Sequence, residues 1–248
     1  MTPMLAKKYD GQDPTGWWMS EKLDGVRAIW TGSKLLSRTG KEFAAPEWFV
    51  KGLPDNLTLD GELWEGRGLF SQTCGKVRKQ INPDWTGIKY MVFDCVCVGT
   101  FAARYRLLYQ TSLPDHIEIV KQCPCSNMDH LNQYERGILN AGGEGVMLKN
   151  PVSSYEQKRS SELLKLKRFI TDEAVVDSYD PGQGKYEGMV GALMCKYRDQ
   201  LIKIGTGLTD SDRREPPGIG SVITFKYFEL TEDKMPRFPV YLACRDYE

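Results

Sequence analysis

Lys22 is the residue of this sequence best placed for nucleophilic chemistry. It lies in the segment 20–27, SEKLDGVR, which follows an aromatic run and contains an Asp-Gly turn. A free lysine amine has a pKa near 10.4, so only about 1 amine in 2,500 is unprotonated at pH 7. Desolvation and neighbouring cations disfavour the ammonium form, and Arg27 is the first candidate cation. Because Lys-x-Asp-Gly also occurs in hairpins with a solvated lysine, this segment alone leaves both interpretations open.

Two acidic residues stand beside glycines. In the apolar segment 57–63 a glycine interrupts a predicted strand and lets the backbone approach a ligand closely, with Glu62 directly after it. Glu144 lies between Gly143 and Gly145, at the entrance of a predicted strand that runs to residue 149. Each carboxylate is a candidate ligand-binding group, and each could also be an ordinary acid at a strand edge.

Two further segments complete the candidate chemistry. Phe93 and Asp94 lie inside the most apolar predicted strand, 88–98, where an acid is unexpected. The alternation in 164–167 predicts that Lys165 and Lys167 point to one face of a strand, either towards a ligand or towards solvent.

Composition and motifs exclude several function classes. The 248 residues carry 33 basic and 33 acidic side chains, so any nucleic-acid partner must bind local patches. No G-x-x-x-x-G-K-[ST] segment is present, which excludes a P-loop. The two histidines are too few for a metal cluster, and the C-x-C spacing of four of the seven cysteines does not favour zinc. No apolar run approaches the ~18 residues of a membrane span, and no signal peptide is visible.

The elements that must position these residues differ between the two parts of the chain. In the first part we expect an irregular lead-in over 2–16, followed by a mixture of strands and helices. The helices are predicted over 46–50, 69–79 and 101–110, and from Ser126, as a capping residue, to the glycines at 142 and 143.

The second part reads as β structure with turns rich in glycine and proline. Five segments within about 80 residues fit a small barrel of the OB type. They are 173–178, 189–197, 201–204, 221–228 and 240–244. We therefore place a domain boundary near residue 168, which gives domains over 1–168 and 169–248.

The segments that carry chemistry occur in the order of a known set of motifs. They are 22–27 (KLDGVR), 37–40 (SRTG), 59–63 (LDGEL), 90–94 (YMVFD), 144–149 (EGVMLK), 164–168 (LKLKR) and, near the end, 237–239 (RFP) with Arg245-Asp246. On these motifs the sequence resembles the covalent nucleotidyltransferases, within them the ATP-dependent DNA ligases, and among those the minimal bacterial ligases of the Lig E type. The resemblance implies an α+β fold, in which an ATP-grasp-like adenylation domain precedes an OB-fold β-barrel.

The resemblance also implies roles for individual residues. Lys22 would attack the α-phosphorus of ATP and hold AMP as a phosphoramide. Glu62 would bind the ribose, and Phe93 would stack on adenine. Glu144 would hold a divalent metal, Mg²⁺ or Mn²⁺, with Glu62 as a second ligand.

Basic residues would contact the phosphates of ATP. Lys165 and Lys167 would contact the α-phosphate, and Arg237 would orient pyrophosphate during the first step. Arg27 and Arg38 would bind phosphates, Arg38 that at a nick. Glu21 completes the predicted nucleotide-binding set.

The implied partner is nicked double-stranded DNA, bound without sequence preference by a monomer and without a membrane. The predicted phosphate contacts are Arg38, Lys76, Arg78, Lys79, Lys158, Arg159, Arg168, Arg213 and Arg214. Such clusters are more often solvated faces than contacts. Relatives of this type often carry an export leader, so the resemblance implies a periplasmic location, with a cytoplasmic one as the alternative.

Two departures from the wider family bear on these expectations. Because 21 residues precede Lys22, we expect neither the amino-terminal DNA-binding domain of large ligases nor the nicotinamide-binding domain of NAD-dependent ones. The chain ends Arg245-Asp246-Tyr247-Glu248, where relatives often have an acid followed by a base, so the terminal residues receive no predicted role.

Two alternatives stay open. An RNA ligase or an RNA-capping guanylyltransferase would use the same lysine chemistry, although the second domain with its 237–239 segment favours a DNA ligase. A non-enzymatic OB-fold nucleic-acid-binding protein would form no covalent adduct and would not need Lys22, Glu62 and Glu144 together.

Overall fold

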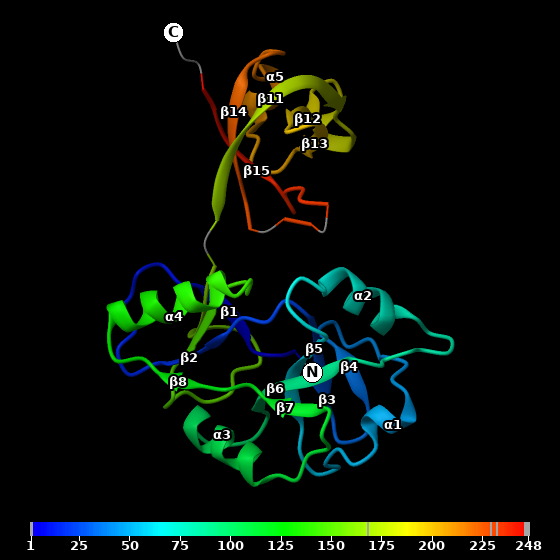
Figure 1. The fold of residues 1–248 in the computed structure, drawn as a ribbon, viewed down its shortest axis with the longest axis vertical. Helices are drawn as coiled ribbons and strands as arrows, with labels where there is room; N and C mark the ends of the chain where they lie inside the picture. The colour runs from blue at the N-terminus through cyan, green and yellow to red at the C-terminus, as the bar shows by residue number, and fades with distance from the viewer. Residues whose placement is uncertain (1, 168, 229, 232, 246–248) are drawn as a thin grey trace. The chain divides into compact units, whose positions relative to one another are not determined.

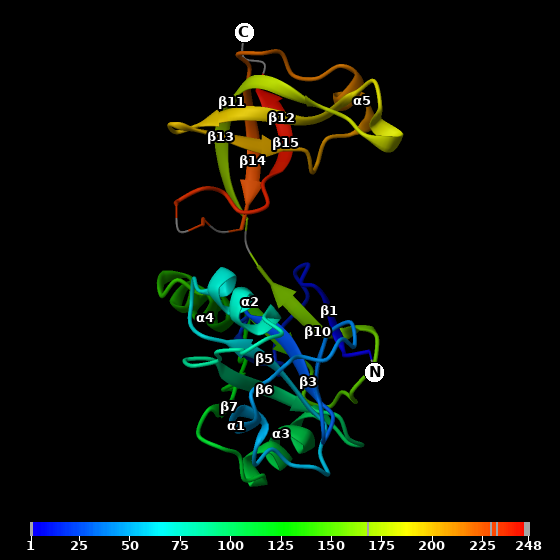
Figure 2. The same ribbon diagram turned by 90° about the vertical axis from the view of Figure 1, so that its right-hand side faces the viewer.

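A computed structural model describes residues 2–167, 169–228, 230–231 and 233–245. The chain forms two compact units, Met1–Lys167 and Arg168–Glu248. Figures 1 and 2 show the elements of each unit from two directions. None of the helices in the described ranges has the length and apolar character needed to cross a membrane.

The first unit contains two mixed sheets. One has the order β1-β10-β9-β2-β8, from β1 (Leu5–Lys8), β10 (Arg159–Leu166), β9 (Val146–Lys149), β2 (Trp18–Glu21) and β8 (Cys123–Pro124). The other has the order β4-β3-β5-β6-β7, from β4 (Leu35–Ser37), β3 (Val26–Trp30), β5 (Leu59–Trp64), β6 (Lys89–Cys95) and β7 (Ile117–Ile119). Chain segments far apart in sequence thus meet in each sheet, as Figure 2 shows for β1 and β10.

Helices in this unit are short and amphipathic. They are α1 (Glu47–Val50), α2 (Phe70–Arg78), α3 (Phe101–Gln110) and α4 (Met128–Asn140). The buried face of α4 contributes Leu131 and Ile138 to a core that also holds Met19, Val146 and Leu148 from β2 and β9. This packing fixes β2, which ends directly before Lys22, and β9, which begins two residues after Glu144.

A larger core lies against the second sheet. It includes Phe49 from α1 and Trp85, whose rings meet edge to face with centroids 4.7 Å apart. Leu59, Leu63 and Tyr90 belong to the same core, so β5 and β6 are held on one face by apolar side chains. Their other residues, Glu62 and Phe93 among them, are free to line a pocket.

Most predicted elements of the first unit are present, and two predictions were wrong. The predicted lead-in contains β1, which pairs in parallel with β10. Helix α4 is capped by Asn127 and not by Ser126, because the Asn127 side chain accepts a hydrogen bond of 2.8 Å from the His130 amide. The Ser126 hydroxyl contacts the His130 ring at 2.8 Å instead.

The second unit is an antiparallel sheet of order β13-β12-β11-β14-β15. Its strands are β11 (Ile170–Pro181), β12 (Val190–Tyr197), β13 (Gln200–Ile204), β14 (Val222–Tyr227) and β15 (Val240–Arg245). All five predicted β segments are therefore confirmed. A bridge between Thr206 and Val240 joins the two ends of the sheet, and in the described residues the strand pairing does not close a barrel.

A short helix, α5 (Asp210–Arg214), and a 3₁₀ turn, Gly184–Tyr186, complete this unit. The sequence reasoning missed α5, although its signal was present: Thr209 and Asp212 form a capping box, with Thr209 Oγ1 accepting from the Asp212 amide at 3.1 Å.

Candidate active site

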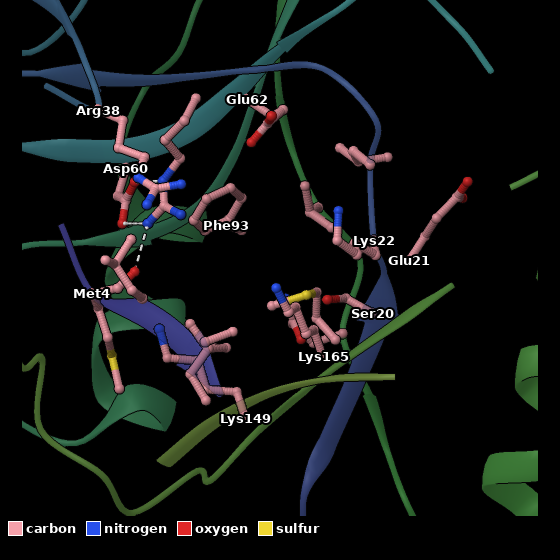
Figure 3. Close-up of a pocket in the computed structure, with 18 of the residues that line it drawn as sticks. Met4, Ser20, Glu21, Lys22, Arg38, Asp60, Glu62, Phe93, Lys149 and Lys165 are labelled. Atoms are coloured by element: carbon pink, nitrogen blue, oxygen red, sulfur yellow. Dashed lines mark hydrogen bonds and ion pairs between the residues drawn. The ribbon is translucent and has the colours of Figure 1, made fainter. Parts of the chain in front are cut away.

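One pocket of about 270 Å³ opens in the first unit at the junction of its two sheets. Strands β1, β2, β9 and β10 line it from one sheet, and β3, β5 and β6 from the other. Between β2 and β3 the chain passes from one sheet to the other, and Lys22 lies in that crossing. Figure 3 shows Lys22, Glu62, Phe93 and Lys165 arranged around a common space.

Lys22 is held in this pocket by two neighbours from the segment 144–145. Its amide donates a 2.8 Å hydrogen bond to the Gly145 carbonyl, and its ammonium forms an ion pair with Glu144. Glu144 also pairs with Lys167, whose Nζ lies 2.5 Å from Oε1. One carboxylate that is only 8% exposed therefore holds two amines, which brings three of the predicted site residues together.

Glu62 lies across the pocket and has an unusual pKa. Burial raises the pKa of its carboxyl to about 7, against the opposing effect of the positive charges on Arg27 and Lys22. Near neutral pH this side chain is divided between a protonated form that donates a hydrogen bond and an ionised form that only accepts.

Arg27, the first candidate cation beside Lys22 in the sequence analysis, is paired with an acid. Asp60 engages it with both oxygens, at 2.6 Å from Nε and 2.6 Å from Nη2, and its Nη2 donates to the Met4 carbonyl at 3.1 Å. The Tyr155 hydroxyl donates to Asp60 at 2.6 Å. Asp60 thus pairs with Arg27, and the predicted help of Arg27 to Lys22 stays a prediction.

Phe93 forms an aromatic wall of the pocket. The Arg27 guanidinium lies over its ring, 4.7 Å from the centroid, which fixes one face of the ring and leaves the other for the cavity. Apolar side chains of Val120, Met147 and Leu163 also line the pocket. The result is a slot with a flat hydrocarbon wall, suited to a planar base.

Cationic side chains occupy other parts of the pocket wall. Arg38, Arg159 and Lys165 all line it. The pKa of Lys165 is lowered, first by burial and then by the nearby charges of Lys22 and Arg159. A cluster of positive charges that repel one another is a site for an anion with several charges.

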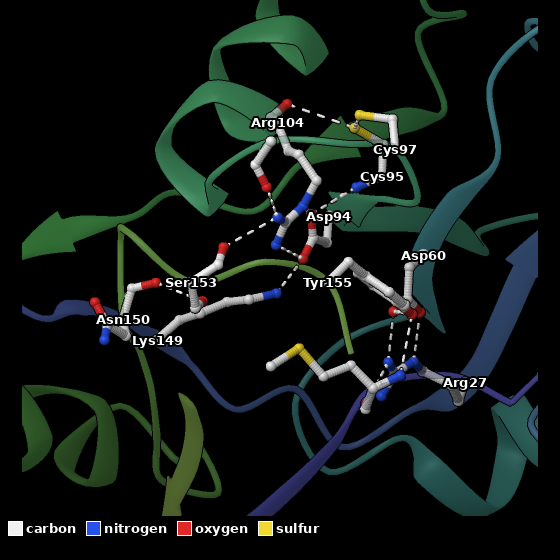
Figure 4. A network of polar contacts seen from close by, with 12 residues as sticks. Arg27, Asp60, Asp94, Cys95, Cys97, Arg104, Lys149, Asn150, Ser153 and Tyr155 are labelled. Atoms are coloured by element: carbon white, nitrogen blue, oxygen red, sulfur yellow. Dashed lines mark hydrogen bonds and ion pairs between the residues drawn. The ribbon is translucent and has the colours of Figure 1, made fainter. Parts of the chain in front are cut away.

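A buried network of ion pairs and hydrogen bonds holds Asp94, the residue after Phe93 in β6 (Figure 4). Asp94, fully buried, accepts from Arg104 at 2.8 Å and 3.1 Å and forms an ion pair with Lys149. Arg104 also donates to the carbonyls of Gly99 and Ser153, at 2.7 Å and 3.1 Å. Burial lowers the pKa of Lys149, while the charge of Asp94 opposes that effect.

Comparison with known proteins decides the family. Residues 3–167 match the ATP dependent DNA ligase domain, and residues 181–245 match the DNA ligase OB-like domain. The DNA ligase of Haemophilus influenzae is 40% identical over 96% of this chain and 90% of its own length. This chain belongs to the ATP-dependent DNA ligases.

Solved structures agree with that assignment. One from a structure–function analysis of Lig E DNA ligases superposes on this ligase with a TM-score of 0.93 at 34% identity, over 99% of both chains. The Chlorella virus DNA ligase-adenylate gives a TM-score of 0.60 at 26% identity, over 100% of this chain and 99% of the other. The predicted resemblance and the predicted fold class, an adenylation domain with an OB-fold domain, are confirmed.

Glu21, which the sequence analysis assigns to nucleotide binding, lines the pocket of the ligase and is paired with Arg67. Arg67 donates two hydrogen bonds to the Glu21 carboxylate, 2.7 Å and 2.8 Å long. Figure 3 shows the Glu21 side chain directed away from the space between Lys22 and Phe93. Because Glu21 is nevertheless among the residues that line the pocket, its role in nucleotide binding stays a prediction.

Two of the predicted DNA contacts of the ligase are engaged within the protein. Arg213 is 7% exposed and donates to the carbonyls of Val190, Gly191 and Gly205, at 2.5 Å to 3.0 Å. Arg213 holds the end of β12, and its buried guanidinium is not available to DNA, so this prediction was wrong. Lys76 forms an ion pair with Glu65 and donates to the Thr86 carbonyl at 2.8 Å, which leaves it poorly placed to bind phosphate.

The other predicted phosphate-contacting residues stay predictions. Arg78, Lys79, Lys158 and Arg214 are exposed, and Lys158 forms a 3.0 Å ion pair with Glu156. Arg159 is exposed and also lines the pocket. Arg168 lies outside the described residues. In the second unit Arg237 lies 5.9 Å from the centroid of the Phe238 ring.

Sequence reasoning overlooked several pocket residues of the ligase. Met4 and Leu5 line the pocket because β1 pairs with β10. No local sequence pattern predicts this pairing. Gln122 also lines it, from a loop with no recognised motif. Lys149 was visible as a base at the end of a strand and Asp94 as an acid in an apolar one, but nothing in the sequence paired them.

Proposed function

We propose that this ligase seals nicks in duplex DNA in three steps that begin at Lys22. The amine attacks the α-phosphorus of ATP, the bond from that phosphorus to the bridging oxygen breaks, and pyrophosphate leaves. The AMP then passes to the 5′-phosphate of the nick, and attack by the 3′-hydroxyl releases AMP. The observation that carries the proposal is one pocket lined by Lys22, Lys165 and the aromatic wall of Phe93, with Glu144 in an ion pair with Lys22.

Before it can attack, Lys22 must lose a proton and part from Glu144, because the ion pair holds its nitrogen away from any other partner. Glu144 Oε2 is the group in contact with the Lys22 Nζ and is placed to accept that proton. Lys167 shares the same carboxylate, so an anion entering the pocket would compete with Glu144 for both amines.

ATP fits the pocket by shape and by charge. Adenine would stack on the free face of the Phe93 ring, and Glu62 would hydrogen-bond the ribose hydroxyls with either of its two protonation forms. Lys165, Lys167 and Arg38 would contact phosphate oxygens, where negative charge develops during the transfer. We further propose that Arg237 of the second unit orients the pyrophosphate.

The donor set also fits a divalent cation. Carboxylate oxygens are the ligands preferred by Mg²⁺, which usually keeps several waters and needs only one or two carboxylates. Glu144 and Glu62 would hold Mg²⁺ or Mn²⁺, because Glu144 lies close enough for its charge to raise the pKa of Glu62. When bound, the cation would supply positive charge to phosphate oxygens and compete with Lys22 for Glu144.

For the DNA we propose contacts by Arg38, by Arg159 and by the exposed cations Arg78, Lys79, Lys158 and Arg214. Such contacts to phosphates bind a duplex without reading its sequence, as nick sealing requires. We propose that the ligase acts as a monomer with an adenylation domain over 1–168 and an OB-fold domain over 169–248, and that it works in the periplasm, with the cytoplasm as the alternative.

Lys22→Ala separates the first step from the last. The variant should form no covalent adduct with α-labelled ATP, yet should seal a nick that already carries a 5′-adenylate, since that step does not use the lysine. The wild type incubated with ATP and a divalent cation should gain the mass of AMP on the peptide that contains position 22. Labelling of the variant would place the nucleophile elsewhere.

The same experiment tests the alternatives. Label transferred from GTP and not from ATP, with triphosphate-ended RNA as acceptor, would favour a capping enzyme over a DNA ligase. Sealing of nicked RNA in preference to nicked DNA would favour an RNA ligase. A wild type that binds DNA but takes no label from either nucleotide would fit the non-enzymatic binding protein.

A further inference from the structure

Arg67 lies outside the proposed chemistry but contacts the residue before the nucleophile. It stands between Gly66 and Gly68, both with positive φ (151° and 75°), in the loop from β5 to α2. These glycines allow the tight path that brings the guanidinium back over Glu21 at the end of β2. The loop belongs to one sheet of the first unit and Glu21 to the other, so the contact spans the two sheets beside the pocket.

The contact has the geometry of a strong ion pair. Nε and Nη2 of Arg67 donate to separate oxygens of Glu21 at 2.7 Å and 2.8 Å, a fork that restricts both side chains. Nη1 donates to the Ala141 carbonyl, the residue after α4, at 3.3 Å. Hydrogen bonding to Glu21 raises the pKa of Arg67. Arg67 thereby ties together a loop, a strand end and a helix end.

The Glu21 carboxylate also lies against the segment that carries Glu144. A Cβ on Gly143 would stand 2.8 Å from Glu21 Oε1 and 2.5 Å from an Ile138 methyl, so only glycine fits there without displacing one of them. Two residues further on, the Gly145 carbonyl accepts the Lys22 amide. Glu21 directly precedes Lys22 in the chain, and its carboxylate lies against the backbone that presents Glu144.

We propose that Glu21 and Arg67 form a clamp that positions Lys22 and Glu144 relative to each other, and that Arg67 is a positioning residue for adenylyl transfer. The clamp touches neither nucleotide nor reacting atoms in the proposed mechanism. It acts by holding the end of β2 against the 143–145 segment. Misplacement of a reacting group by about 1 Å can cost up to ~10²-fold in rate. This inference rests on Lys22 being the nucleophile.

The test measures the single-turnover rate of Lys22 adenylylation over a range of ATP concentrations. Arg67→Met, which keeps the stem and removes the fork, should lower the rate at saturating ATP about 10- to 100-fold and change the ATP concentration for half-maximal rate less than about 3-fold. Arg67→Lys, which keeps the charge, should recover part of the rate. An unchanged rate in Arg67→Met, or a defect confined to ATP affinity, would overturn the proposal.

A double-mutant cycle shows whether the two residues act together. Glu21→Gln alone should slow the reaction, and Glu21→Gln combined with Arg67→Met should be no slower than the slower single variant. Rate losses that multiply would refute a clamp. Lys89→Met, which removes an exposed ion pair with Glu118 outside the pocket, is the matched control and should keep the wild-type rate.

Two readouts keep the outcomes distinct. Thermal unfolding of each variant shows whether a slow rate reflects loss of the fold. If Arg67→Met does not fold, the adenylylation rate of Glu21→Gln tests the clamp in its place. If the wild type forms no adduct at Lys22, the proposed function fails before the clamp is tested. If the wild type forms the adduct and both variants form it at the same rate, the clamp alone fails.

Discussion

Asp94→Asn should be one of the most damaging single substitutions in the first unit. Asp94 is fully buried and is the shared anion of two buried cations, Arg104 and Lys149. The asparagine keeps the size of the side chain and removes the negative charge, so the substitution creates no cavity. Its effect therefore reports electrostatics and hydrogen bonding and not packing.

The magnitude follows from burial. Removing one partner of a buried ion pair costs about 3–5 kcal/mol, because the other charge is left without compensation. Here two cations lose their anion, but Arg104 keeps the Gly99 and Ser153 carbonyls and Lys149 can release its proton. We therefore expect a loss of about 3–5 kcal/mol in the free energy of unfolding near neutral pH and not twice that value.

The pH dependence gives the sharper test. Burial already lowers the pKa of Lys149, and loss of the Asp94 charge lowers it further. Between that lowered pKa and the ordinary value of 10.5, the unfolded state binds more protons than the folded state, so stability rises with pH. The cost of Asp94→Asn should accordingly be smaller at pH 9 than at pH 6.

Denaturant unfolding followed by tryptophan fluorescence is the suitable assay, because all six tryptophans lie in the first unit. Glu42→Gln, which removes the carboxylate of an exposed 2.7 Å ion pair with Lys34 in the same unit, is the matched control. It should lose no more than about 1 kcal/mol. A loss below about 1 kcal/mol for Asp94→Asn at both pH values, or a cost that is the same at both, would refute the reasoning.

Two further predictions test single features. Between pH 4.5 and about 7 the folded state keeps the Glu62 proton that the unfolded state has lost, so the free energy of unfolding of the wild type should fall by about 3 kcal/mol as the pH rises. Glu62→Gln should remove this fall. Denaturant titrations at pH 5 and pH 8 check this, and an equal fall in wild type and variant would contradict it. Asn127→Ala should lower the free energy of unfolding by about 1 kcal/mol because it removes the cap of α4, and Ser126→Ala should lower it less. A larger loss for Ser126→Ala would show that Ser126 is the cap, as the sequence predicted.

The elements that could be predicted from the sequence are those with a strong local signal. The five β segments of the second unit follow from alternating apolar residues between glycine and proline turns, and α3 follows from its 3.6-residue periodicity. Strand β1 could not be predicted, because it gains its stability from parallel pairing with β10 about 150 residues away. No pattern within residues 5–8 carries that information.

The candidate site divides in the same way. Lys22, Glu62, Phe93 and Lys165 were predicted from motifs, and the structure brings all four to one pocket. The pairing of their neighbours was not predictable, since nothing in the sequence shows that Arg27 is held by Asp60. Whether a charged side chain is free or neutralised depends on contacts across two sheets, and sequence order does not show those contacts.

The ion pairs of the pocket fall into two kinds, and the difference has a mechanistic consequence. Arg27 with Asp60 and Lys149 with Asp94 have acids that are 1% and 0% exposed, held by several donors each. If either pair separated, a buried charge would be left without compensation. These two pairs therefore stay intact and hold the pocket walls in place.

Glu144 is of the other kind: its partner Lys22 is 24% exposed, and the carboxylate meets only that amine and Lys167 among the contacts described. A pair that water can reach on the lysine side is separated at much lower cost than a fully buried one. Among the ion pairs described here for the site, the more easily separated carboxylate thus lies next to Lys22, the amine that the proposed reaction must release, whereas the buried pairs lie around the Phe93 wall.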